Sequence, residues 1–282
     1  MTKVVENKDN KYVIIKNIIY FCAITAFMFF VAYWSLDGSH LDFDTYYSLE
    51  GDPTAMEMHI RSIQENGLKG LYYNYRIGAP EEASALVDAT GVDFMLGLMI
   101  WVLNILFRPT TARLFYYTLI LTFIVIAWAM SYLLHKLKID PVVNFVFSSL
   151  FSLAPYHFYR YMDHLALGNA FTVPLAVLLC LYVLEIVDDD RLADRIIYAL
   201  CGLMLGLGCA YYTFFGFIIM LMAVIMKWAN LKSIKDLLKR LWVIAVTVFG
   251  FGLSRTPALL LTMADGENTY AFVRRAFEQE IY

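Results

Sequence analysis

Apolar runs long enough to cross a lipid bilayer recur along most of this chain of 282 residues. A helix needs about 20 apolar residues to span the hydrocarbon core, which is about 30 Å thick. The runs lie at about 13–35, 112–134, 141–158, 169–187, 195–211, 213–228 and 241–262, with a further run at 91–107. Because lipid offers no partner for backbone polar groups, repeated spans of this length predict an all-α polytopic membrane protein.

Composition excludes a soluble domain and a nucleic-acid partner. The chain is 60% hydrophobic and 17% charged, whereas soluble domains are about 45–50% apolar and about 25% charged. The net charge of −3 offers no basic surface to a phosphate backbone. All four cysteines lie within apolar runs without metal-ligand spacing, which favours plain packing.

The run at 91–107 decides the topology, because two arrangements compete. If it spans, most lysines fall outside the cell, against the positive-inside rule. If it does not span, the cytoplasmic side holds most of the 22 Lys and Arg residues, namely Lys3, Lys8, Lys11, Lys16, Lys136, Lys138, Arg191, Arg195, Lys227, Lys232, Lys235, Lys239 and Arg240. We therefore predict about seven spans, a cytoplasmic N-terminus, and 91–107 as a re-entrant or surface-lying helix.

The same topology defines the predicted domains and location. Lysines precede the first apolar run and no cleavage site follows it, so we expect a retained anchor in the cell (inner) membrane. Residues 1–262 form a transmembrane module whose first extracytoplasmic loop covers about 36–111. Because residues 263–282 stop without a terminal helix, we expect them to begin an extracytoplasmic segment of a truncated chain.

Acidic residues open the first loop. Asp52 followed by Pro53 predicts the start of an amphipathic helix over 54–66, which Gly67 ends. Its apolar side carries Met56, Ile60 and Ile63, whereas His59, Arg61 and Glu65 face away from that side. Asp52 is then either a helix cap or a general base above the membrane. Asp42 and Asp44 form an Asp-x-Asp triplet that either binds a divalent metal, which prefers oxygen ligands, or belongs to a solvated loop.

Aromatic and basic residues give the other candidates. Tyr75 and Arg76, beside a Gly-Ala-Pro turn, are either a sugar-binding surface or part of an interfacial aromatic belt. In the second loop, Arg160 and Asp163 are spaced to pair on a helix, as a structural ion pair or beside His164 in the cavity of Asp52.

Two arginines at predicted helix ends favour a phosphate ligand. Arg113 and Arg255 both lie at the extracytoplasmic side of the predicted bundle. Arginine suits bidentate phosphate contacts, and Arg255 is deep for a charge, which favours a phosphate ligand over a snorkelling side chain.

This arrangement resembles the GT-C superfamily of membrane glycosyltransferases, which has a seven-helix module and a long first loop with an acid opening a surface helix. Gly51-Asp52-Pro53 and the segment Asn74 to Pro80 are similar to YfhO-like members. The segments Ala112-Arg113-Leu114 and Arg160 to Asp163 are similar to the aminoarabinose-transferase and protein-mannosyltransferase branch. In that branch two acids are often adjacent in the first loop, whereas Pro53 follows Asp52 here. The resemblance therefore does not decide whether the reaction depends on a metal ion.

The resemblance implies transfer of a sugar from a polyprenyl-phosphate donor to a cell-envelope glycan, lipid or protein. It implies that Asp52 is the base, that Asp163 is a second acid, and that Arg255 and Arg113 hold the lipid phosphate. One alternative is a lipid or sugar flippase or transporter, although the spans carry few ionisable groups. The other is a non-catalytic membrane assembly protein.

Overall fold

The computed structural model describes residues 2–40, 42–45, 51–72, 93–161, 164–187, 191–229 and 234–264. Every regular element within these ranges is a helix, which confirms the all-α prediction. In chain order they are α1 (Thr2–Ser35), α2 (Gly51–Asn66), the 3-10 helix η1 (Gly67–Leu71), α3 (Phe94–Phe107), α4 (Thr111–Lys136), α5 (Pro141–Ser152), α6 (Pro155–Tyr161), α7 (Leu165–Gly168), α8 (Thr172–Val183), α9 (Leu192–Leu207), α10 (Ala210–Ala229) and α11 (Ile234–Ala264).

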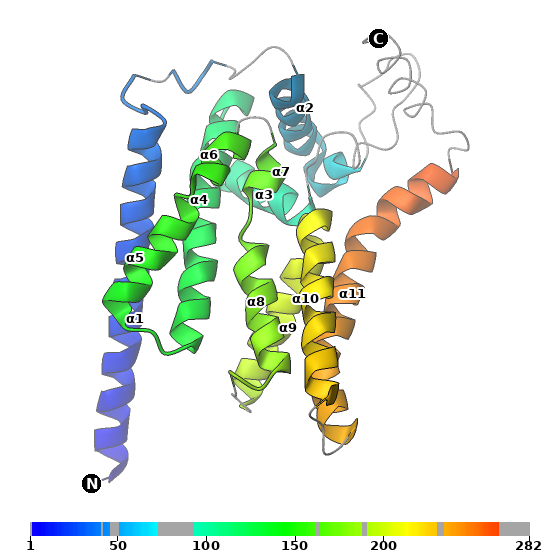
Figure 1. Ribbon diagram of the computed structural model, residues 1–282. Helices are drawn as coiled ribbons and strands as arrows, with labels where there is room; N and C mark the ends of the chain where they lie inside the picture. Colours follow the sequence, from blue (N-terminus) through cyan, green and yellow to red (C-terminus); the bar gives the residue numbers. More distant parts are fainter. Residues whose placement is uncertain are drawn as a thin grey trace.

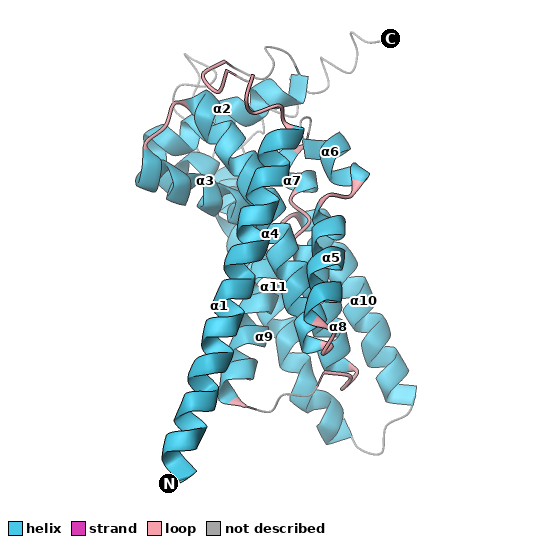
Figure 2. Ribbon diagram, turned by 90° about the vertical axis from the view of Figure 1, so that its left-hand side faces the viewer, coloured by secondary structure: helices cyan, strands magenta, loops and turns pink. Residues whose placement is uncertain are grey.

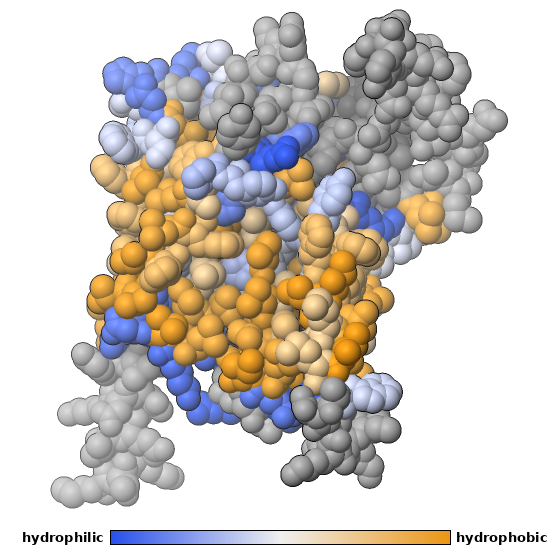
Figure 3. Space-filling view, in the orientation of Figure 1, coloured by the Kyte–Doolittle hydropathy of each residue, from blue (hydrophilic) through white to orange (hydrophobic). Residues whose placement is uncertain are grey.

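Three helices in the described ranges are long and apolar enough to cross a membrane: Ile15–Ser35 of α1, Thr111–Lys136 of α4 and Ala210–Trp228 of α10. The visible face carries an apolar band with hydrophilic side chains above and below it (Figure 3). A water-soluble protein would expose no such band, because large exposed apolar patches mark contact with lipid or protein. The chain therefore has the build of a membrane protein.

Helix α4 is the centre of the fold and α1 packs on its outside (Figures 1 and 2). Along α1, Ile24, Met28 and Ala32 are buried at a spacing of four residues, so one narrow stripe faces the protein. Large side chains on its other faces, such as Phe30 at 65% exposure and Trp34 at 74%, point outward. This pattern suits a helix that lies between protein and lipid.

Helix breaks shorten three of the predicted spans. The run predicted at 141–158 is not one helix, because α5 ends at Ser152 and Pro155 begins α6. Proline disfavours helical backbone in the residue before it, which explains the break. The run at 169–187 contains only α8, and the run at 195–211 ends as α9 before Gly208. As single helices within the described ranges, these elements fall short of a full span.

Glycine permits a close contact between α9 and α11. A Cβ atom at Gly206 would lie 2.3 Å from the carbonyl oxygen of Thr247 and 2.6 Å from the backbone nitrogen of Phe251. A Cβ atom at Gly250 on α11 would also meet the backbone of α9, 2.8 Å from the carbonyl oxygen of Leu203. Small residues let helix backbones approach in this way inside membranes. The pair α9–α11 is thereby set as a close-packed unit.

Helices α2 and α3 lie at the end of the molecule where α1 finishes (Figures 1 and 2). Met56, Ile60 and Ile63 are buried, which confirms the apolar side predicted for α2, but the helix begins at Gly51, three residues earlier than predicted. It ends at Asn66, and Gly67 follows with φ of 64°. That left-handed backbone suits glycine and confirms the predicted stop.

The side of α2 predicted to face away from the apolar residues is partly buried in the protein. His59 is 1% exposed, whereas the prediction placed it outside. Burial lowers the pKa of His59 to about 4. Helix α3, at 14 residues, is about 21 Å long, which is shorter than a bilayer core of about 30 Å.

Ion pairs fasten the opposite end of the molecule, near the start of α1. Nζ of Lys136 in α4 lies 2.7 Å from a carboxylate oxygen of Asp194 in α9. Lys227 in α10 pairs with Glu185, which follows α8. Lys136, Asp194 and Lys227 are largely buried and Glu185 is half-exposed. Because a buried charge needs a partner, these contacts match α4 to α9 and α8 to α10.

Candidate functional site

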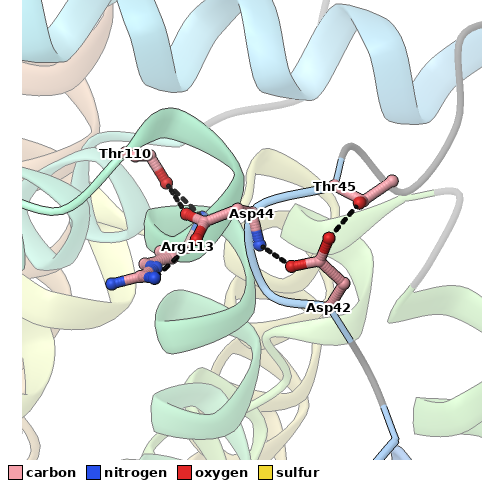
Figure 4. Close-up of polar contacts among 5 residues, drawn as sticks. All are labelled: Asp42, Asp44, Thr45, Thr110 and Arg113. Atoms are coloured by element: carbon pink, nitrogen blue, oxygen red, sulfur yellow. Dashed lines mark hydrogen bonds and ion pairs between the residues drawn. The ribbon is translucent and has the colours of Figure 1, made fainter.

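A compact turn at Asp42–Thr45 forms the first part of the candidate site, which lies where α1, the first loop and α4 meet (Figure 4). The carboxylate of Asp42 accepts a hydrogen bond of 3.0 Å from the backbone N–H of Asp44 and one of 2.8 Å from the hydroxyl of Thr45. These two bonds, the backbone one first, lower the pKa of Asp42. Asp42 therefore orders the turn as an ionised side chain.

Asp44 connects this turn to the beginning of α4. Its carboxylate accepts a 3.0 Å hydrogen bond from the hydroxyl of Thr110 and pairs with Nη2 of Arg113 at 2.5 Å. Thr110 also caps α4, accepting the backbone N–H of Arg113 at 3.3 Å. One helix start thus holds a loop carboxylate and an arginine together.

A cavity of about 440 Å³ lies directly beside these charges. Its wall is formed by Phe29, Tyr33, Asp42, Phe43, Asp44, Arg113, Tyr117 and Ile120. The lining therefore combines carboxylates and one guanidinium with aromatic rings. Phe29 is 51% exposed on α1, so the cavity reaches the apolar outer surface of the molecule. A volume of this size matches small-ligand pockets, which are usually about 300–1,000 Å³.

The contacts of Asp42 and Asp44 can be compared with their predicted role as ligands of a divalent metal ion. Asp42 and Asp44 lie close together, but each carboxylate already accepts protein hydrogen bonds. Across the described ranges, no group of three His, Cys, Asp or Glu side chains gathers in a way that could hold a metal ion. The arrangement is that of a hydrogen-bonded loop with an ion pair to Arg113.

Several predicted site residues fall outside what the structure describes. Asp163, Tyr75 and Arg76 lie outside the described residues, and of Asp52 only the backbone, in the first turn of α2, is described. The predicted proximity of Asp52 and Asp163 therefore stays a prediction.

The remaining predicted residues of the second loop lie near α6 and α7. Arg160 is exposed in α6, and its carbonyl accepts the backbone N–H of His164 at 2.7 Å. His164 is half-buried and directly precedes α7. This backbone hydrogen bond joins Arg160 and His164 in the structure.

Arg255 belongs to a second cluster, built around a residue that the sequence reasoning did not single out. Asp93 caps the N-terminus of α3, with one carboxylate oxygen accepting the backbone N–H of Leu96 at 2.7 Å. It is 6% exposed, and its Oδ2 atom has no hydrogen-bond partner in the described part of the chain. The charge of Arg255 acts on this carboxyl, but burial is the larger influence and raises the pKa of Asp93 to about 7.

The same cluster attaches the first loop to α11. The hydroxyl of Tyr72, after η1, donates a hydrogen bond of 3.2 Å to the carbonyl oxygen of Ser254, which precedes Arg255. Guanidinium carbon Cζ of Arg255 lies 5.8 Å from the centre of the Phe251 ring, within range of a cation–π contact. Arg255 is thus held in place at the join between η1, α3 and α11.

One sequence signal could have identified Asp93. An acid directly before a long apolar run is a helix N-cap signal, but the run predicted at 91–107 includes Asp93. Its proximity to Arg255, far along the chain, carries no sequence signal at all.

Comparison with protein-family models, curated proteins and solved structures found no match to this chain.

Proposed function

We propose that this protein transfers a sugar from a polyprenyl-phosphate donor to a cell-envelope acceptor at the end of the bundle that carries α2 and α3. The observation that carries the proposal is the cavity of about 440 Å³ beside α1 and α4. It places ionic groups and aromatic rings next to a helix that is long and apolar enough to span the membrane.

The chemistry of the cavity suits a saccharide. The carboxylates of Asp42 and Asp44 accept hydrogen bonds from hydroxyl groups, as they already do from Thr45 and Thr110. Tyr33 and Tyr117 supply aromatic rings to the wall, and such rings pair an apolar body with a polar tip. Arg113 pairs with Asp44 through Nη2, and a guanidinium carries five N–H donors, so donors are left for sugar oxygens.

Membrane placement is part of this proposal. The proposed topology has about seven spans, with α2 and α3 lying on the extracytoplasmic surface. Its support is that α4 and α10 end with Lys136 and Lys227 in their last turns, that these helix ends lie opposite the end carrying α2 (Figure 1), and that lysines favour the cytoplasmic side. Phe29 at the cavity then faces lipid, so a lipid-linked substrate reaches the site from within the bilayer.

The proposed chemistry is proton removal from an acceptor hydroxyl as the sugar leaves its phosphate. Asp52 remains the residue predicted to remove that proton, with Asp163 as a second acid. General-base catalysis contributes about 10²–10⁴-fold to a rate. Asp52→Asn should therefore lower turnover by about two orders of magnitude or more.

The test is a turnover assay on membranes that contain the full-length protein. Donors are polyprenyl phosphates carrying labelled glucose, mannose or aminoarabinose, and transfer to envelope material is counted. Asp52→Asn is compared with wild type, and Lys138→Gln, an exposed residue at the opposite end, serves as the matched control. Turnover by Asp52→Asn equal to wild type removes the assigned base, and no transfer by wild type from any donor refutes the transferase.

A further inference from the structure

The break between α9 and α10 gathers buried polar groups that the cavity does not use. Helix α9 ends at Leu207 and α10 begins at Ala210, so Gly208 and Cys209 form the connection. A Cβ atom at Gly208 would lie 2.8 Å from the methyl carbon of Thr172, the first residue of α8. The charges of Asp93 and Arg255 both act on the thiol of Cys209. Residues of α3, α8, α10 and α11 therefore border this one connection.

Asn169 belongs to the same region. It lies between Leu167, whose carbonyl oxygen accepts a hydrogen bond from the Tyr212 hydroxyl in the first turn of α10, and Thr172, which packs on Gly208. Both polar side-chain atoms of Asn169 and the hydroxyl of Thr172 are buried without a hydrogen-bond partner in the residues the structure describes. Each residue is only 1% exposed. Native proteins almost always satisfy such groups, so they indicate a bound polar ligand.

The electrostatics of the region favour an anion. Helices α3, α8 and α10 all present their N-terminal ends here, at Asp93, Thr172 and Cys209. Helix N-termini carry unpaired N–H groups and partial positive charge. No side-chain cap bonds the start of α8 among the described residues. Arg255 adds a full positive charge, and an uncharged Asp93 carboxyl would act as a hydrogen-bond donor.

We propose that the Gly208–Cys209 connection is the floor of a phosphate-binding site, in which Arg255 provides the charge and Asp93, Asn169 and Thr172 donate hydrogen bonds to phosphate oxygens. The ligand is a phosphate group, which a lipid carrier or a free phosphate can supply. The choice of the lipid carrier rests on the proposed function and extends it, since it locates the phosphate of the donor.

Phosphate binding at this site is linked to protonation of Asp93. A bound anion disfavours the ionised carboxylate, so the phosphate should bind with uptake of a proton. The groups that face Asp93 are Arg255 on α11, Cys209 before α10 and the backbone N–H of Leu96 on its own helix. Because the pKa of Asp93 is raised to about 7, affinity should fall as pH rises from 6 to 8. Asp93→Asn, an uncharged donor, should reduce this fall.

The test measures binding to the full-length protein in lipid nanodiscs by isothermal titration calorimetry. The probes are farnesyl phosphate, farnesol and inorganic phosphate, each without an acceptor. Thr172→Val keeps the methyl group on Gly208 and removes the hydroxyl, so farnesyl phosphate should bind about three- to tenfold more weakly, the size of effect of one lost hydrogen bond. Farnesol should not bind at this site, and inorganic phosphate should bind more weakly than the lipid.

Thr118→Val is the matched control, because the hydroxyl of Thr118 is equally buried but already donates to the carbonyl oxygen of Leu114 at 2.7 Å. It should leave phosphate affinity unchanged. Thermal unfolding without ligand should show Thr172→Val to be as stable as wild type, since its hydroxyl has no partner to lose among the described residues.

Two results would overturn the inference. One is equal farnesyl phosphate affinity in wild type, Thr172→Val and Arg255→Gln. The other is an unchanged pH dependence in Asp93→Asn. Transfer activity that persists with such results would leave the proposed function intact. Phosphate binding that follows the predictions without any transfer would refute the function and keep the site.

Discussion

At the scale of single residues, burial decides which carboxyl groups are chemically unusual. Asp42 and Asp93 both begin a turn or helix by accepting backbone N–H groups. Asp42 is exposed, and its hydrogen bonds lower its pKa. Asp93 is buried, and loss of water outweighs its hydrogen bonds and Arg255. The same residue type in the same local role therefore has a lowered pKa at Asp42 and a raised pKa at Asp93. Of the two, only Asp93 changes charge near neutral pH.

The raised pKa of Asp93 predicts how stability depends on pH. In the unfolded chain this carboxyl loses its proton near its ordinary value of 3.8, whereas in the folded protein it keeps it to about 7. Ionisation then favours unfolding, so stability should fall as pH rises from about 4 to about 7 and level off above that. Asp93→Asn keeps the N-cap, because asparagine caps as well as aspartate, and removes the charge.

Thermal unfolding of the detergent-solubilised protein at pH 4.5 and pH 7.5 measures this effect. Asp93→Asn should raise the Tm at pH 7.5 more than at pH 4.5, by a free energy of up to a few kcal/mol at about 1.4 kcal/mol per pKa unit. Asp140→Asn, at the exposed N-cap of α5, is the control and should keep the wild-type profile. An Asp93→Asn profile identical to wild type would show that this carboxyl ionises normally.

At the scale of elements, the sequence predicted where helices lie better than where they end or what they touch. Spacing of apolar residues predicted the buried side of α2, and Gly67 predicted its end. Apolarity alone did not reveal the break before Pro155, because an apolar run of residues does not distinguish one long helix from two short ones. The pairing of Asp44 with Arg113, 69 residues later, depends on how α1 packs on α4, and no local pattern encodes it.

The close packing of α9 on α11 predicts a strong effect of one methyl group. Gly206→Ala places a Cβ atom within 2.6 Å of two backbone atoms of α11, which must move. Overpacking of this kind costs about 1–3 kcal/mol. Gly252→Ala, on the same α11, meets nothing within 4 Å and should be neutral or slightly stabilising, since alanine favours a helix over glycine.

Comparison of the two Tm values in the same detergent separates packing from helix propensity, because both variants make the same chemical change. Gly206→Ala should unfold several degrees lower than Gly252→Ala. Equal Tm values would mean that α9 and α11 do not meet at this glycine.

At the scale of the whole molecule, the two ends of the bundle carry different groups of polar side chains. The end with α2 and α3 holds the cavity, the Asp44–Arg113 pair and the Asp93–Arg255 cluster. The opposite end holds the Lys136–Asp194 and Lys227–Glu185 pairs, which fasten neighbouring helices. An apolar band lies between the two ends on the visible face (Figure 3). The proposed chemistry and the ion pairs between helices therefore lie at opposite ends of the bundle. The positive-inside rule predicts the same division, because it assigns the lysine-rich end to the cytoplasm.

That division makes the orientation testable with one reagent and two positions. Arg61 is exposed on α2, and Lys138 is exposed in the α4–α5 connection at the other end (Figure 1). In a Cys22→Ser background, which removes the exposed native thiol, a membrane-impermeant maleimide should label Arg61→Cys in intact cells and Lys138→Cys only after permeabilisation. Labelling of Lys138→Cys alone in intact cells would put the cavity in the cytoplasm, where the proposed envelope acceptor is absent. Labelling of both would mean that α4 does not separate the two sides, and the apolar band would then be covered by a protein partner instead of lipid.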